Sequence, residues 1–107
     1  MEKTALEDAA KQIKKLYTQA TVLLFGSYAK NEMTEESDID LCIIIENPKE
    51  RLLVISRNIR RKIHPLLHKP LDLLVYDKKQ FEDRASLSLT MEAEIKKQAI
   101  ELWKKMI

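Results

Sequence analysis

Glycine is almost absent from this chain. Average usage would place about seven glycines in a protein of this size, whereas the 107 residues contain one, Gly26. Glycine is the residue that most readily adopts positive φ angles and lets another group approach the backbone closely. We therefore expect the chain to need backbone freedom at Gly26.

Cysteine and long apolar runs are also scarce. The single cysteine, Cys42, excludes an intramolecular disulfide and fits a reducing compartment. The longest apolar runs, residues 41–45 and 52–55, are far shorter than the ~20 residues of a membrane-spanning helix. The first eight residues include acidic side chains and lack the apolar segment of a signal peptide. We expect a cytoplasmic protein that forms one domain over residues 1–107 and has no membrane partner.

An excess of charge of one sign is missing too. The chain has 19 Lys and Arg residues against 17 Asp and Glu residues, which leaves a formal net charge of +2. Domains that bind nucleic acid through bulk charge usually have a pI above about 9. The charge balance therefore argues against direct nucleic-acid binding, and it also argues against an acidic disordered tail.

Three short segments have the composition of buried strands. Residues 21–25, 39–45 and 71–76 are rich in β-branched and apolar side chains without helical spacing. Amphipathic helices are predicted around and between them, so we expect an α/β (α+β) fold with helices packed on a small mixed β-sheet. A helix between the second and third strands predicts a parallel, right-handed crossover, and the direction of the first strand is left open.

Capping residues and apolar spacing predict the helices. Thr4–Glu7 has the form of a capping box with Thr4 as N-cap. A second helix starts its apolar stripe at Leu52 and should end or kink near Pro65. Asp77–Gln80 resembles another capping box and opens a short helix that contains Phe81. A last helix is expected to start near Ser86 or Ser88 and to present one apolar face, made of Met91, Ile95, Ala99, Leu102, Trp103 and Met106.

Three aspartates occupy positions where strands rarely tolerate them. Asp38 and Asp40 lead into the apolar second strand, and Asp72 lies between two leucines at the start of the third. Residues two apart in a strand share a face, so Asp38 and Asp40 should project together. If the third strand pairs with the second, Asp72 lies about 5 Å away in the hydrogen-bonding direction. An uncompensated buried carboxylate costs several kcal/mol, so we expect a cation to offset this cluster.

Carboxylates in this arrangement are ligands that suit Mg²⁺, which proteins usually hold with one or two carboxylates and substrate phosphates. Two such ions, about 4 Å apart, support in-line phosphoryl or nucleotidyl displacement. One carboxylate can also orient or deprotonate the attacking hydroxyl, and Asp72 is the candidate because it comes from the other strand.

A phosphate site is predicted upstream, where Phe25-Gly26-Ser27 ends a strand and enters a turn. Backbone amides at such a turn, together with a serine hydroxyl, bind anions. Gly26 allows the backbone to approach phosphates closely, and Lys30 adds a positive charge. A phosphate site next to metal-binding carboxylates favours a nucleoside triphosphate as substrate.

Phe25-Gly26-Ser27, ten further residues, Asp38-Ile39-Asp40-Leu41 and the later Asp72 together resemble the nucleotidyltransferase superfamily that includes DNA polymerase beta. The resemblance spans roughly residues 20–106 and implies the polymerase beta-like nucleotidyltransferase fold. The short chain is similar to the minimal nucleotidyltransferases that pair with helical HEPN ribonuclease toxins. It departs from the family pattern at Lys30, where arginine is usual, and at Asn31, where glycine is common.

The resemblance also implies a role for each matching residue. Gly26 and Ser27 would bind the triphosphate, with Lys30 nearby as a charge that lacks the two-pronged geometry of arginine. Asp38 and Asp40 would bind two Mg²⁺ ions, and Asp72 would complete the catalytic carboxylates and support the acceptor hydroxyl.

These features favour an enzyme that transfers AMP from ATP to a hydroxyl group and releases pyrophosphate. The resemblance implies that the acceptor is a tyrosine of a HEPN toxin, which makes the chain an antitoxin. The chain has no room for an acceptor-binding domain, so the acceptor site would be shared with another chain in a homo- or hetero-oligomer. Two alternatives remain open: a catalytically idle module that neutralises a partner by contact, and a subunit that modifies a small molecule such as an aminoglycoside.

Other chemically capable residues have simpler interpretations. His64 and His68 have metal-ligand spacing, but Pro65 interrupts them and no third ligand is evident. Cys42 is expected to be a small buried side chain, and Ser37 a turn residue. The basic stretch 57–62 is interpreted as the solvated face of a helix rather than a site for RNA or a partner. For Tyr28, stacking on a base and acting as an acceptor both stay open.

Overall fold

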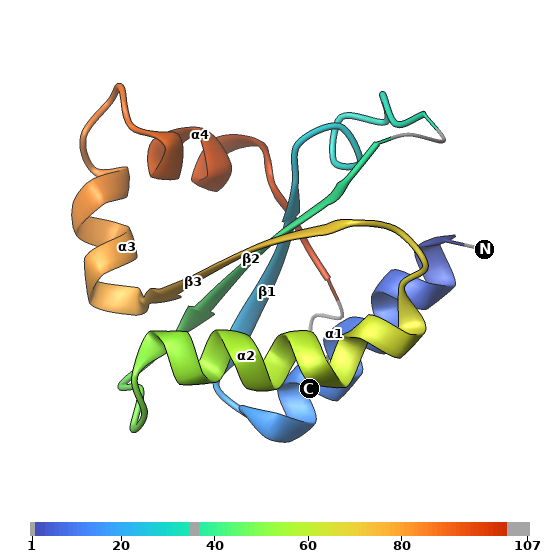
Figure 1. The fold of residues 1–107 in the computed structure, drawn as a ribbon. Helices are drawn as coiled ribbons and strands as arrows, with labels where there is room; N and C mark the ends of the chain where they lie inside the picture. Colours follow the sequence, from blue (N-terminus) through green and yellow to red (C-terminus); the bar gives the residue numbers. More distant parts are fainter. Residues whose placement is uncertain (1, 35–36, 103–107) are drawn as a thin grey trace, which may run out of the picture.

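The computed structural model describes residues 2–34 and 37–102 and alternates helices with strands (Figure 1). The helices are α1 (Glu2–Leu16), α2 (Leu52–Ile63), the 3-10 turn η1 (His64–Leu66), α3 (Lys78–Ala85) and α4 (Met91–Gln98). The strands are β1 (Ala20–Phe25), β2 (Ile39–Ile45), β3 (Leu71–Asp77) and β4 (Ile100–Glu101).

The four described strands form one mixed sheet in the order β3-β2-β1-β4. β2 and β3 are parallel and are joined through α2, which confirms the predicted crossover. β1 runs antiparallel to both β2 and β4, which settles the direction that the sequence left open.

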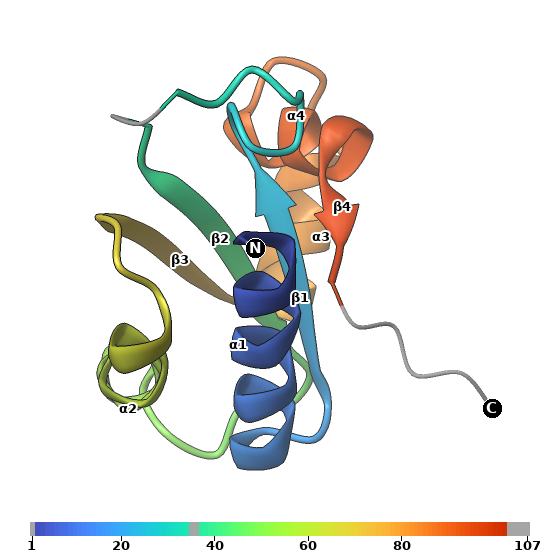
Figure 2. The ribbon, with the colours of Figure 1, turned by 90° about the vertical axis from the view of Figure 1, so that its right-hand side faces the viewer.

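Helices cover both faces of this sheet (Figure 2). The main core lies under α1 and α2 and includes the fully buried side chains of Ile13, Leu41, Ile43, Ile55, Ile59 and Ile63. A smaller core on the other face joins Cys42 and Ile44 of β2 to Phe81 of α3 and Ile95 of α4. Alternate residues of β2 therefore enter different cores, as the period of a strand requires.

Two of the predicted helix boundaries are wrong. α1 begins at Glu2, so Thr4 lies inside the helix and is not its N-cap. The last helix begins at Met91, after the N-cap Thr90, and ends at Gln98. Ala99 is extended, and β4 then pairs with the outer edge of β1 through Leu23↔Glu101 and Leu24↔Ile100.

Tertiary pairing explains why the last helix stops early. The Leu102 amide donates to the Val22 carbonyl at 2.8 Å, and the Leu102 side chain enters the main core. The helical spacing of apolar residues therefore continues past the real end of the helix, because these residues serve a different layer. Trp103 and Met106, which the apolar spacing places on the same helix, lie outside the described residues.

Other local predictions are confirmed. Asp77 caps α3 by accepting a hydrogen bond from the Lys79 amide at 3.0 Å. α2 ends at Ile63, and Pro65 lies in the following 3-10 turn. None of the helices in the described part of the chain is long and apolar enough to cross a membrane.

Candidate active site

Asp40 and Asp72 lie next to each other on adjacent parallel strands. They are register partners in the β2–β3 pair, and neighbouring strands are about 4.8 Å apart. Strand parity places Asp40 on the face of Cys42 and Ile44, which is the face covered by α3 and α4. Asp72 shares that face with Leu74 and Tyr76, which pack on the same smaller core. The predicted pairing of the two strands is confirmed, and it places Asp40 and Asp72 at the same level of the sheet.

Asp38 lies just before β2, two residues from Asp40, and its side chain is exposed. Burial raises the pKa of the Asp40 carboxyl, and repulsion from Asp72 and then from Asp38 raises it further. Both of the other predicted carboxylates therefore act electrostatically on Asp40. Ionised Asp40 is an unfavourable charge in this protein, and a nearby cation would relieve it.

Gly26 packs directly against Asp40. Phe25 and Asp40 are register partners across β1 and β2, and Gly26 follows with a φ of +74°. A Cβ atom at this position would overlap the Oδ2 atom of Asp40. The glycine is therefore required twice, for its backbone angle and for the space that the carboxylate fills.

A tight turn follows Gly26 and contains Ser27 and Lys30. The Lys30 amide donates to the Gly26 carbonyl at 3.2 Å, and the Glu32 amide donates to the Ser27 carbonyl at 2.8 Å. Ser27 is half-buried and Lys30 is exposed. The turn thus begins at Gly26, which contacts Asp40, and Ser27 follows directly in the chain.

The chemistry of the donors fits a hard divalent cation, because three carboxylates supply only oxygen ligands. The side chains themselves are not drawn together: within residues 2–34 and 37–102, no three His, Cys, Asp or Glu side chains form a cluster that could hold a metal ion. His64 and His68 are both exposed and belong to no such cluster in this described part. Mutual repulsion opposes closer approach of the aspartates.

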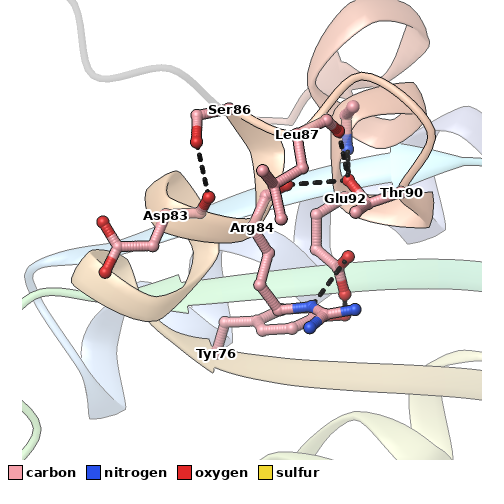
Figure 3. Close-up of polar contacts among 8 residues, drawn as sticks. Tyr76, Asp83, Arg84, Ser86, Leu87, Thr90 and Glu92 are labelled. Atoms are coloured by element: carbon pink, nitrogen blue, oxygen red, sulfur yellow. Dashed lines mark hydrogen bonds and ion pairs between the residues drawn. The ribbon is translucent and has the colours of Figure 1, made fainter.

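A second polar group on the same face was not predicted from the sequence. The Glu92 carboxylate is 4% exposed; the Tyr76 hydroxyl donates to Oε2 at 2.6 Å, and Arg84 Nε lies 3.1 Å from Oε1 (Figure 3). The Tyr76 hydrogen bond is the main cause of a lowered Glu92 pKa. Burial raises the pKa of the Cys42 thiol to about 12, and Glu92 contributes to the rise. A sequence signal did exist, since Glu92 precedes the buried Ile95 by one helical turn.

Tyr28 and Cys42 are both buried among core side chains. Tyr28 is 5% exposed and packs in the main core, so its ring is not a surface for stacking a base. Cys42 is fully buried in the smaller core, as expected. Ser37 lies in a turn, where its Oγ accepts a hydrogen bond from the Thr34 amide at 2.8 Å.

The sequence profile of the nucleotidyltransferase domain matches residues 6–101, which includes Gly26, Ser27 and all three aspartates. The chain belongs to this family of nucleotidyltransferases. It is 34% identical over 88 residues to a protein of Methanocaldococcus jannaschii named "Putative protein adenylyltransferase MJ0126". That alignment covers 76% of this chain and 88% of the relative.

Solved structures share the fold of this nucleotidyltransferase. A crystal structure described as a putative nucleotidyltransferase from Sulfolobus solfataricus superimposes with a TM-score of 0.62 at 16% identity, over 96% of this chain and 80% of the other. A crystal structure of a toxin-antitoxin with AMP-PNP gives a TM-score of 0.58 at 16% identity, over 92% and 73% of the two chains. Both comparisons show that the mixed sheet with its helices is a fold that these solved structures share.

The departure of this nucleotidyltransferase from the family pattern at Asn31 has a local explanation. Asn31 has a φ of +57°, a left-handed conformation that glycine adopts freely and that asparagine tolerates better than other residues. The backbone of the turn is therefore kept although the glycine is absent. The replacement at Lys30 keeps the positive charge on an exposed side chain.

Proposed function

We propose that this nucleotidyltransferase transfers AMP from ATP to a hydroxyl group of a protein, with Asp38, Asp40 and Asp72 as its catalytic carboxylates. The observation that carries the proposal is the pairing of Asp40 with Asp72 on one face of the sheet, with Gly26 packed against Asp40. The adenylyltransferase name of the relative supports the choice of AMP and of a protein acceptor.

The proposed reaction is a single displacement at the α-phosphorus of ATP. The acceptor oxygen forms a bond to that phosphorus while the bond to the bridging oxygen of pyrophosphate breaks, and pyrophosphate leaves with the electron pair. Asp72 receives the proton of the acceptor hydroxyl on a carboxylate oxygen. Gly26 and Ser27 hold the phosphates through the turn, and Lys30 adds a positive charge close to them.

Asp38, Asp40 and Asp72 are the residues that would hold Mg²⁺, at two ions per site. When bound, Mg²⁺ neutralises the phosphates and stabilises the attacking and leaving oxygens of an in-line displacement. The raised pKa of Asp40 supports this assignment, because burial and then repulsion from Asp72 and Asp38 raise it, and a nearby cation would offset both effects.

The acceptor that we propose is a tyrosine of a HEPN-type toxin, which the transferred AMP would silence. The fold likeness to a toxin-antitoxin structure is compatible with it. In this proposal the chain is an antitoxin whose acceptor site is completed by its partner.

The test is a labelling reaction with purified protein, Mg²⁺, ATP labelled at the α-phosphate and cytosol from the source organism. We expect one labelled protein band, and we expect Asp40→Asn to reduce the label by about 100-fold or more, as for loss of other transition-state charge stabilisers. Asp83→Asn is the matched control, because Asp83 is an exposed aspartate on α3. Mass spectrometry of the band identifies the protein and the modified side chain.

Other outcomes contradict specific parts of the proposal. Label in small molecules alone would assign a small-molecule acceptor. Neutralisation of the toxin by Asp40→Asn as effectively as by the wild-type protein would assign a contact mechanism without transfer. A labelled serine or threonine in the band would keep the reaction and overturn the tyrosine.

A further inference from the structure

Positive charge is concentrated in one segment of this nearly neutral chain. Residues 51–71 contain six Lys and Arg residues and two histidines, and none of the 17 Asp and Glu residues of the chain. The remaining residues hold 13 basic side chains against the 17 acidic ones. The segment comprises α2, η1 and the loop that leads into β3, so these charges follow one continuous part of the fold.

Part of this segment forms a groove of about 560 Å³. Arg60, His64, His68 and Lys69 line it, together with two prolines and two leucines. The lining therefore combines groups that attract anions with apolar surface. No described lining residue is a Phe, Tyr or Trp.

Two of the basic side chains are held in place. Arg60 Nη1 donates to the Leu71 carbonyl at 3.1 Å, which fixes the guanidinium at the start of β3. Lys69 Nζ donates to the Thr34 carbonyl at 3.3 Å and lies 5.6 Å from the centre of the Tyr28 ring. Fixed side chains lose less entropy when they bind a ligand, so the groove is partly preorganised.

The groove reaches the residue of β3 that precedes Asp72. Leu71 lines the groove, and the next residue is Asp72. Adjacent strand residues point to opposite faces, so the groove and the Asp72 carboxylate flank the same strand. β3 is the outer strand of the described sheet, so its free edge pairs with no other described strand and separates the groove from the Asp72 face.

We infer that this groove binds an acidic, extended segment of the protein acceptor and so brings the acceptor hydroxyl to Asp72. The inference rests on the proposed function and adds the chemical class of sequence that the enzyme recognises. Charge complementarity supplies the attraction, and the prolines and leucines suit the apolar side chains of a polypeptide. Single-stranded nucleic acid fits less well, because its bases stack on aromatic side chains that the described lining lacks.

The inference is tested by binding rather than by catalysis. A fluorescent oligoglutamate peptide with one tyrosine is titrated with the full chain at low ionic strength, where screening is weak. We expect Arg60→Gln with His68→Gln, which removes two of the four basic side chains that line the groove, to weaken binding about tenfold. Arg61→Gln with Lys62→Gln is the matched control, since both side chains are exposed on α2 but do not line the groove. The control should remain within about twofold of the wild-type protein.

Three results would overturn the inference. These are equal losses in the two double variants, absence of peptide binding by the wild-type protein, and groove-dependent binding of oligouridylate that is tighter than that of the peptide. Thermal melting of each variant confirms that it is folded. The titration contains neither ATP nor Mg²⁺, so failure of the proposed transfer leaves its readout unchanged, and failure of the groove leaves the transfer intact.

Discussion

Gly26 illustrates how a single residue links the turn to the carboxylates. Its φ of +74° disfavours any L side chain by about 1–2 kcal/mol, and an added Cβ would overlap the Asp40 carboxylate. We expect Gly26→Ala to displace Asp40, to lower the free energy of unfolding by at least about 1 kcal/mol and to reduce nucleotide transfer about 100-fold. Urea denaturation and the labelling reaction measure the two effects.

Asn31→Gly is the control for this variant, because it also changes a residue with positive φ in the same turn. Its unfolding free energy should change by no more than about 0.5 kcal/mol, since asparagine and glycine both adopt this conformation. Full activity and stability in Gly26→Ala would show that the turn tolerates a side chain and that Asp40 does not depend on the glycine.

The single residue Glu92 predicts that the free energy of unfolding depends on pH. The Tyr76 hydrogen bond and the Arg84 ion pair lower the pKa of Glu92 in the folded protein. A lowered acid pKa contributes stability above the ordinary glutamate value of about 4.3, and this contribution is lost as the pH falls through the folded value. We expect Glu92→Gln to lower the unfolding free energy by about 2 kcal/mol at neutral pH, with the difference shrinking in acid.

Glu94→Gln is the matched control on the same helix. Glu94 is exposed and accepts one hydrogen bond from Gln98 Nε2 at 2.9 Å, four residues away. Such a helical pair contributes about 0.2–0.5 kcal/mol, so this variant should have little effect at any pH. Urea denaturation at several pH values compares the two, and a constant deficit for Glu92→Gln down to acid pH would contradict the ionised state of Glu92.

At the scale of secondary-structure elements, the sequence predicts the bounds that local signals determine. It does not predict the bounds that depend on pairing with a distant strand. The predicted bounds of β2 coincide with Ile39–Ile45, because a polar loop precedes its apolar run and Asn47, with a φ of +53°, turns the chain after it. β4 was missed because its two residues are defined only by pairing with β1. The helical spacing of α4 continues in the sequence beyond the residue where the helix ends.

In the candidate site, too, local pattern predicts some features and tertiary packing determines the others. Strand parity and the parallel crossover are enough to predict that Asp40 and Asp72 share a face, and the observed register between β2 and β3 agrees with that prediction. The Glu92 carboxylate was not predicted, because Tyr76, Arg84 and Glu92 come from β3, α3 and α4 and meet only when these elements pack. Gly26 was identified by its rarity, whereas its contact with Asp40 required the three-dimensional structure.

The cap of α4 provides a test at this scale. The Thr90 hydroxyl accepts a hydrogen bond from the Ala93 amide at 3.1 Å, and Thr90 Oγ1 lies 2.8 Å from the Arg84 carbonyl, to which it donates. It thereby joins the end of α3 to the start of α4, next to Glu92. We expect Thr90→Ala to lower the unfolding free energy by about 1 kcal/mol and to speed amide exchange at Ala93. Thr90→Ser keeps the hydroxyl and should retain most of the protection, whereas equal exchange in both variants would exclude the cap as the cause.

At the scale of the whole molecule, the two faces of the sheet differ: one carries the larger apolar core, and the other carries the candidate site. The face under α1 and α2 holds the larger apolar core, with Ile13, Leu41 and Ile59 fully buried. The opposite face holds the smaller core together with Asp40 and Asp72. Natural enzymes commonly tolerate unfavourable interactions at their active sites when the rest of the fold is stable enough. Here the unfavourable interaction is the burial of Asp40 beside two other aspartates.

This separation predicts that a variant can lose activity and gain stability. Asp40→Asn removes a partly buried charge that Asp72 and Asp38 repel. A gain of about 0.5 kcal/mol would raise the Tm by about 2–4 °C in a domain of this size. We expect that rise at neutral pH in the presence of a chelator, and we expect the loss of nucleotide transfer in the separate labelling reaction with Mg²⁺. Asp83→Asn, which changes an exposed aspartate, should leave both the Tm and the transfer unchanged. A lower Tm in Asp40→Asn would mean that Asp40 stabilises the fold. It would contradict the expectation that the Asp40 charge lowers the free energy of unfolding.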